Sequence, residues 1–162
     1  MNINDVTFAD LGTATGKGVR IGIVAAAWHN DIVQELINGA VDTLHIHGVE
    51  GDHISLYRCP GTYEIPVVAA TLIDHDAVDA VITLGVVIRG ETAHFEYVAS
   101  PVMHSLQELA TQTCVPCIAG ILTTENVQQA WDRAGGSAGH KGRESALAAL
   151  HMVNLLRAIR TS

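Results

Sequence analysis

The sequence predicts an α/β fold in which one parallel sheet carries helices on both faces. Residues 80–88 are an almost unbroken run of Val, Ile, Leu and Ala, which is typical of a strand covered on both faces. Four such apolar stretches are each followed by a segment whose apolar residues recur at helical spacing. Repeats of strand then helix form parallel sheets, because each crossover helix brings the next strand back in the same direction.

The composition fits a single domain in the reducing cytoplasm. A chain of 162 residues, 48 % of them hydrophobic, can bury a core of its own. The net charge of −8 argues against nucleic acid and anionic membrane surfaces as partners. Three cysteines form no disulfide framework, and no apolar run approaches membrane-spanning length. Residues 1–17 are polar and do not resemble a signal peptide, so we expect an extended arm there and one domain over 18–162.

The first two repeats supply two strands and two helices. The first strand is expected over 19–27, and Asn30 or Asp31 is placed to cap the next helix. That helix has one apolar stripe, which consists of Val33, Ile37, Ala40 and Leu44. The second strand is expected over 54–59. The turn 60–66 contains a proline suited to the start of a helix that continues to Asp74.

The second half follows the same pattern. After the strand at 80–88 we expect a long helix over 92–113. Pro101 should bend this helix or shift its start, at a cost of about 3 kcal/mol if it is truly interior, without touching the site. The fourth strand is expected over 116–122, with Thr123 or Thr124 capping a short helix to Ala134. A glycine-rich connection then leads to a last helix. Its apolar stripe consists of Ala146, Ala149, Leu150, Val153 and Leu156.

The stretch 84–97 combines an anion site with a group that can move protons. Gly85 and Gly90 let the backbone approach something closely, and Thr92 can cap a helix whose N-terminus favours an anion. His94 follows closely and titrates near neutral pH. Both groups lie at the carboxyl end of a parallel strand, where open α/β sheets bind ligands. A nucleotide-binding P-loop is disfavoured, because Glu91 stands where the motif needs a lysine.

Four further residues are candidates for ligand binding, each with a plainer alternative. Glu64, beside Tyr63, either binds a polar ligand or is a surface carboxylate. Trp28 either stacks on a flat heterocycle or packs in the core. Arg133 and Lys141 flank the glycine-rich connection, and either bind phosphate or lie in a solvated loop.

No metal site is expected from the cysteines and histidines. His94-x-Glu96 with Cys114-x-x-Cys117 resembles a zinc deaminase pattern. That pattern requires both cysteines at a helix start, whereas here Pro116 separates them and Cys117 enters a strand. A redox pair is disfavoured as well, because Cys114 closes a helix and gains no stabilisation as a thiolate. Packing is the better interpretation of both cysteines.

Taken together, the motifs resemble the lumazine synthase family over nearly the whole chain from Gly18 onward. The matching stretches are Trp28, 60–66, 84–97, 120–125 and 133–142, and Val87-Ile88-Arg89-Gly90-x-Thr92-x-His94-Phe95 is the most specific of them. The resemblance implies a flavodoxin-like three-layer sandwich with a four-stranded parallel sheet. It also implies a transferase that needs no cofactor or metal. The family condenses 5-amino-6-(D-ribitylamino)uracil with 3,4-dihydroxy-2-butanone 4-phosphate to 6,7-dimethyl-8-ribityllumazine, the penultimate step of riboflavin biosynthesis.

The resemblance also implies a role for each candidate residue. His94 would transfer protons, Trp28 would stack on the pyrimidine, and Glu64 beside Tyr63 would hold the ribityl hydroxyls. Backbone contacts to the pyrimidine would come from Val87 and Ile88. The phosphate pocket would be lined by Gly90, Glu91, Thr92 and Arg133, with Lys141 nearby. Ala119 stands where many members carry a large ring, so stacking there should be weaker.

Finally, the resemblance implies an oligomeric enzyme. In the family, the segment at Ala119 and the arginine matching Arg133 come from a neighbouring subunit of a pentamer. The arm before Gly18 would add to a neighbour's sheet, and the short glycine-containing turn at 133–142 favours an icosahedral shell of pentamers. A non-catalytic shell or flavin-binding protein on the same fold is the rival interpretation. The presence of His94, Glu64 and Arg133 together argues against it.

Overall fold

The structure is a computed structural model that describes residues 13–75 and 78–162. Most of the arm predicted over 1–17 lies outside these residues. Of the remainder, Ala14 is buried in the core, and Gly16 N–H donates to His47 O at 2.8 Å. In the described residues, no helix has both the length and the apolar character needed to span a membrane.

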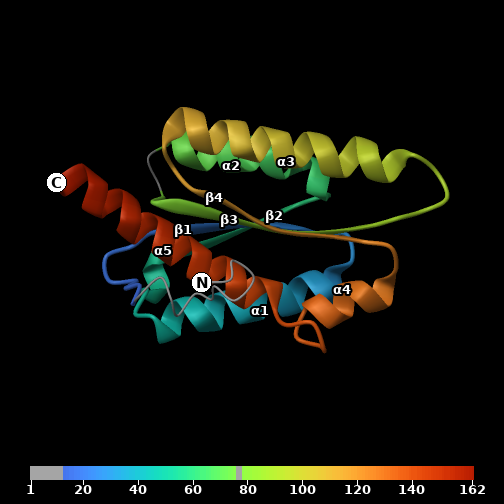
Figure 1. Ribbon diagram of the computed structural model, residues 1–162, viewed down its shortest axis with the longest axis horizontal. Helices are drawn as coiled ribbons and strands as arrows, with labels where there is room; N and C mark the ends of the chain where they lie inside the picture. Colours follow the sequence, from blue (N-terminus) through green and yellow to red (C-terminus); the bar gives the residue numbers. More distant parts are fainter. Residues whose placement is uncertain (1–12, 76–77) are drawn as a thin grey trace, which may run out of the picture.

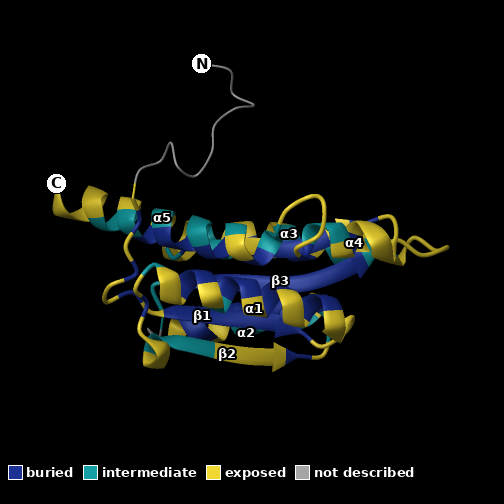
Figure 2. Ribbon diagram, turned by 90° about the horizontal axis from the view of Figure 1, so that it is seen from below, coloured by how far each residue is buried: buried dark blue, intermediate teal, exposed yellow. Residues whose placement is uncertain are grey.

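The sheet has four parallel strands in the order β2-β1-β3-β4. The strands are β1 (Ile21–Ala26), β2 (Ile54–Cys59), β3 (Ala80–Ile88) and β4 (Cys117–Thr124). Ile21 lies opposite both Ile54 and Ala80, so β1 is paired along both of its edges. Figure 2 shows β1 and β3 buried along their length and β2 partly exposed at the sheet edge. The parallel α/β sandwich predicted from the sequence is confirmed.

The helices form one layer on each face of the sheet (Figure 1). One face is covered by α2 (Ile65–Asp74) and α3 (His94–Thr113), and the other by α1 (Asn30–Ile46), α4 (Val127–Arg133) and α5 (Lys141–Thr161). Successive residues of a strand point to opposite faces, so β1 supplies Ile23 to one core and Val24 to the other. Both predicted helical stripes face the core, with only Leu156 half-buried.

Helices α1 and α5 lie backbone to backbone. A Cβ at Gly142 would stand 2.0 Å from Leu36 O, and one at Gly39 would stand 2.2 Å from His140 Cε1. A methyl group at Gly142 therefore has no room against the backbone of α1, and one at Gly39 would require the His140 ring to move. The contact also fixes where α5 begins, because Gly142 lies in its first turn against α1.

The predicted capping residues for α1 and α4 are wrong. Helix α1 begins at Asn30, after His29 turns the chain with a positive φ of 56°, and Asn30 Oδ1 accepts from Arg58 Nη2 at 2.6 Å instead. Strand β4 continues through Thr124, so the cap of α4 falls on Asn126, whose Oδ1 accepts from Gln129 N at 2.9 Å. The sheet and its turns, rather than capping preference, decide these boundaries.

Candidate active site

A cavity of about 810 Å³ opens at the carboxyl ends of β1, β2 and β3. It lies where the sequence places the ligand edge, since ligands of open α/β sheets bind beyond the strand ends. Its lining comes from the β1–α1 turn, the turn after β2, the end of β3 and the start of α3. The residues are Trp28, His29, Pro60, Gly61, Thr62, Tyr63, Glu64, Val86, Val87, Ile88, His94, Tyr97, Val98 and Pro101.

The end of β3 forms the floor of the cavity. Because Gly85 of this strand has no side chain, another part of the chain packs directly against the strand. A Cβ at Gly85 would stand 2.7 Å from Thr62 Oγ1, so only glycine lets the turn η4 (Thr62–Glu64) lie this close to the strand. Thr62 is buried there. The close approach predicted at Gly85 is therefore an approach of this turn, which places Tyr63 and Glu64 at the cavity.

Three aromatic rings of the cavity are exposed. Trp28 is 68 % exposed, Tyr63 60 % and Tyr97 73 %. Exposure excludes core packing as the role of Trp28. Large rings at a cavity edge present flat apolar surfaces on which a heterocycle stacks favourably.

Glu64 is held by the turn that carries it. Its Oε2 accepts from Gly61 N at 2.9 Å, while Glu64 N donates to Gly61 O at 3.3 Å. Among the described residues, Oε1 has no hydrogen-bond partner. The carboxylate is thus fixed by one oxygen and offers the other to the cavity, which suits recognition of a polar ligand.

Helix α3 presents one face to the cavity. His94, its first residue, is followed at helical spacing by Tyr97, Val98 and Pro101. The expectation that Pro101 does not touch the site is wrong, because seven residues after His94 the helix returns to the same side. The same spacing could have revealed Tyr97 and Val98, which the sequence interpretation missed. The prediction that Thr92 caps α3 is wrong: the N-cap residue is Ala93, and Thr92 Oγ1 accepts only a long hydrogen bond of 3.4 Å from His94 N.

The two candidate cations lie apart from this cavity. Arg133 ends α4 and Lys141 begins α5, on the opposite face of the sheet from α3 (Figure 1). Arg133 makes a bidentate pair with Glu144, with Nη1–Oε1 at 2.9 Å and Nη2–Oε2 at 2.7 Å. Burial raises the pKa of Glu144, but the hydrogen bonds and charge of Arg133 outweigh it, so the pKa lies below its ordinary value. Lys141 Nζ lies 3.9 Å from the same carboxylate.

The comparisons with known proteins agree over most of the chain. A family model described as 6,7-dimethyl-8-ribityllumazine synthase matches residues 18–157. The 6,7-dimethyl-8-ribityllumazine synthase of Porphyromonas gingivalis is 43 % identical to the chain over 156 residues, which cover 96 % of each. The chain belongs to the 6,7-dimethyl-8-ribityllumazine synthase family. The namesake enzymes of Chlorobaculum parvum and Chlorobium phaeobacteroides are 42 % and 43 % identical over 146 residues, covering 90 % of this chain and 94 % of each relative.

For a lumazine synthase family member, the structure brings together one part of the predicted site. The cavity gathers Trp28, Tyr63, Glu64, Val87, Ile88 and His94. The predicted phosphate-binding segment Gly90, Glu91 and Thr92 is exposed on the way into α3 and does not line the cavity. Ala119 is exposed on the edge strand β4 and, like Arg133 and Lys141, lies outside the cavity.

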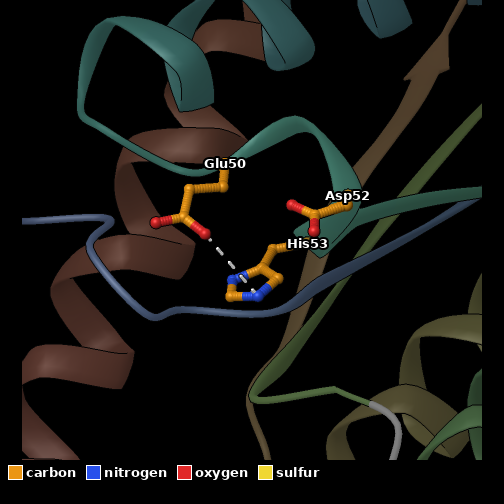
Figure 3. Close-up of side chains that lie close together, drawn as sticks. All are labelled: Glu50, Asp52 and His53. Carbon is orange, nitrogen blue, oxygen red and sulfur yellow. Dashed lines mark ion pairs between the residues drawn. The ribbon is translucent and has the colours of Figure 1, made fainter.

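The described residues contain one cluster of possible metal ligands, away from this cavity. Glu50, Asp52 and His53 surround the amino end of β2, at the other end of the sheet (Figure 3). His53 Nε2 lies 3.9 Å from Glu50 Oε2, and both carboxylates are exposed. Cys117, of the dismissed zinc pattern, has a pKa raised to about 11 by burial, which disfavours the thiolate that a metal needs.

Proposed function

We propose that the chain condenses 5-amino-6-(D-ribitylamino)uracil with 3,4-dihydroxy-2-butanone 4-phosphate in this cavity, and that a neighbouring subunit completes the phosphate end of the site. The reaction forms 6,7-dimethyl-8-ribityllumazine, phosphate and water, the penultimate step of riboflavin biosynthesis, and it is supported by the family match, which covers most of the chain. The observation that carries the assignment of the site is the convergence of Trp28, Glu64 and His94 on one cavity.

The pyrimidine substrate has a binding surface of suitable shape in this cavity. Its flat ring would stack on Trp28, while the backbone of Val87 and Ile88 at the end of β3 would bond its polar edge. The unpaired Oε1 of Glu64 would accept hydrogen bonds from the ribityl hydroxyls, and Tyr63 would lie beside it. These contacts need no metal or cofactor.

His94 is placed to move protons in the reaction. An amine condenses with a ketone to an imine with loss of water, phosphate is eliminated, and a ring closes with loss of a second water, so each step transfers a proton between reactants that already tend to combine. Holding the two reactants together supplies most of the acceleration. The imidazole, exposed at the cavity edge, would add about 10²-fold or more by general acid–base catalysis.

The phosphate end of the site supports an oligomer. Gly90, Glu91 and Thr92 would bind the phosphate with an Arg133 and a Lys141 supplied by a neighbour, whose Ala119 would face the pyrimidine. Two observations favour this arrangement. Arg133 and His94 lie apart within one chain, and the aromatic rings of the cavity are exposed. The free cysteines Cys59, Cys114 and Cys117 suit the reducing cytoplasm.

We further propose a pentamer that assembles into an icosahedral shell. The turn between α4 and α5 is compact: Gly135 N donates to Gly139 O at 3.0 Å, and both glycines have positive φ, 114° and 94°. Sedimentation at physiological salt tests the shell. One very large species is expected, and a lone pentamer at every salt concentration would contradict it.

The reaction itself is tested by mixing the purified chain with both substrates and following the fluorescence of the lumazine product. We expect product formation without added metal or cofactor. A chain that binds the pyrimidine but forms no product would instead be the non-catalytic binding protein or shell that shares this fold.

A further inference from the structure

Arg89 follows β3 directly, and its side chain joins three parts of the molecule. Its Nη1 donates to Glu96 Oε1 in the first turn of α3. Its Nε lies 2.9 Å from Glu125 Oε2 and 3.1 Å from Oε1, in the turn between β4 and α4. The guanidinium carbon stands 4.1 Å from the centroid of the Phe95 ring, in a cation–π contact. The backbone N–H of Arg89 donates to Thr124 O at 2.8 Å, which ties the residue to β4 as well.

We call Arg89 with its two carboxylate partners, Glu96 and Glu125, the clamp. The segment 90–93, between Arg89 and the start of α3, has few contacts of its own. Residues 90–93 are exposed, and a Cβ at Gly90 would meet nothing within 4 Å. Thr92 makes only the long bond from His94 N, and Ala93 O accepts from Glu96 N at 3.2 Å. In the described structure, the Arg89–Glu96 pair closes this segment into a loop whose far end bears His94.

The charges of Glu96 and Glu125 hold the guanidinium of Arg89 in ion pairs. Hydrogen bonds to Glu96 and Glu125 raise the pKa of Arg89, and the hydrogen bond from Arg89 lowers the pKa of Glu96. Arg89 and Glu96 therefore both stay charged at neutral pH. Two carboxylates compete with any anion for one guanidinium, so Arg89 is poorly suited to bind the substrate phosphate itself.

We propose that Arg89, held by Glu96 and Glu125, is a positioning residue that fixes the segment 90–94, of which His94 lines the cavity, before substrate arrives. It touches no substrate. The inference rests on the proposed function, which gives this segment the phosphate-binding groups and the proton-transfer histidine. Pre-ordered geometry matters there, because a misplacement of about 1 Å costs on the order of 10²-fold in rate.

A matched pair of variants tests the proposal. Arg89→Met removes the clamp, and Arg157→Met removes a similarly exposed arginine whose Nη2 lies 3.1 Å from Asp79 Oδ2 at the far end of the sheet. We expect Arg89→Met to raise the KM for the butanone phosphate and the inhibition constant of inorganic phosphate about tenfold, and to lower kcat by a similar factor. The affinity for the pyrimidine should change less than about twofold. Arg157→Met should leave all four quantities as they are.

Amide hydrogen exchange gives a readout that does not depend on turnover. Exchange of residues 90–94 should accelerate in Arg89→Met and not in Arg157→Met. Equal exchange in both variants, or equal loss of affinity for both substrates in step with a lower Tm, overturns the proposal. A wild-type chain that forms no lumazine overturns the proposed function instead, and the exchange comparison then decides alone whether Arg89 holds the segment.

A double-mutant cycle tests whether the carboxylate of Glu125 acts by holding Arg89. Glu125→Gln should cause a smaller loss than Arg89→Met, because Glu96 still holds the guanidinium. The combination of the two should be no worse than Arg89→Met alone. Additive losses would show that the residues act independently, and would overturn the proposal.

Discussion

The cavity under α3 and the turn that carries Arg133 differ in how their polar groups are held. Around the cavity, Trp28 and His94 are exposed and Glu64 keeps one oxygen unpaired. At the turn, both terminal nitrogens of Arg133 are bound by Glu144. The first region is ready to receive a neutral, flat molecule. In the second region the guanidinium of Arg133 is already paired with Glu144. A phosphate that binds there must share the guanidinium with this carboxylate.

This difference indicates which parts of the proposed substrate site one chain supplies and which part must come from a neighbouring subunit. The residues proposed for stacking and hydroxyl binding, Trp28 and Glu64, line one cavity of a single chain, whereas the proposed phosphate ligand Arg133 lies on the other face of the sheet (Figure 1). If the site is divided as proposed, assembly is a requirement of the reaction. Breaking each region separately should therefore produce distinguishable defects.

The largest effect is expected from His94→Ala, which removes the proton-transfer group from the cavity. Turnover should fall about 10²-fold or more, and it should not vanish, because the reactants are still held together. Steady-state kinetics on the assembled protein measure this. A folded and assembled variant with no activity at all would mean that His94 does more than transfer protons.

Arg133→Ala should act on the other region alone. Loss of a bidentate charge-assisted contact is worth roughly 1.5–3 kcal/mol, which is about a 10- to 150-fold rise in the KM for the butanone phosphate. Binding of the pyrimidine, measured separately, should hardly change. Equal weakening for both substrates would indicate damage to the fold or the assembly.

Mixed assemblies sharpen the comparison further. If Arg133 serves a neighbour's site, chains carrying His94→Ala and chains carrying Arg133→Ala should complement each other after joint refolding. In an equal mixture about one quarter of the sites would hold both native residues, and activity should recover to about that fraction. Failure to recover would place both residues in the site of one chain.

Trp28→Ala should have a moderate effect, confined to the cavity. Stacking on one ring contributes about 0.5–1.5 kcal/mol, so the KM for the pyrimidine should rise roughly two- to twelvefold. Trp28→Phe keeps a flat ring and should restore most of the affinity. A larger change for the phosphate substrate than for the pyrimidine would contradict the assignment of Trp28.

The smallest effect concerns pH and the Arg133–Glu144 pair. Because the folded pKa of Glu144 lies below its ordinary value, the pair stabilises the fold above that ordinary value and is lost as the pH falls through the folded pKa. Between about pH 6 and pH 2, the free energy of unfolding should therefore fall less in Glu144→Gln than in the native chain. Glu108 on α3, which accepts from Gln112 at 3.0 Å, provides a control whose Gln variant should leave that dependence intact.

Much of the fold could be predicted, because the controlling signals are local. Strand β3 was predicted residue for residue, since a run that is apolar on both faces has few other uses. The caps of α1 and α4 could not be predicted. At His29 the chain turns in a conformation that non-glycine residues rarely adopt, and the pairing of β4 to Thr124 moves the next helix start to Asn126.

The site was predictable to a different degree in its two regions. Strand ends identify the ligand edge, and helical spacing from His94 could have added Tyr97 and Pro101 to it. Spacing along the chain does not say that Arg133 lies on the opposite face of the sheet from α3. Nor does it show that Glu144 already holds this arginine, because residues eleven apart across a turn meet only in the folded chain.

The contact between α1 and α5 has a consequence for any mutational scan of this chain. A side chain at Gly142 would meet the backbone of Leu36, and one at Gly39 would meet the imidazole of His140, so most substitutions at either position should destabilise the fold. In a growth selection for riboflavin supply, the two glycines would give the same intolerance profile as His94. A scan scored by fitness alone would then mark a pair of helix glycines as reactive centres, although neither lines the cavity. Scoring protein abundance alongside growth would separate the two kinds of position.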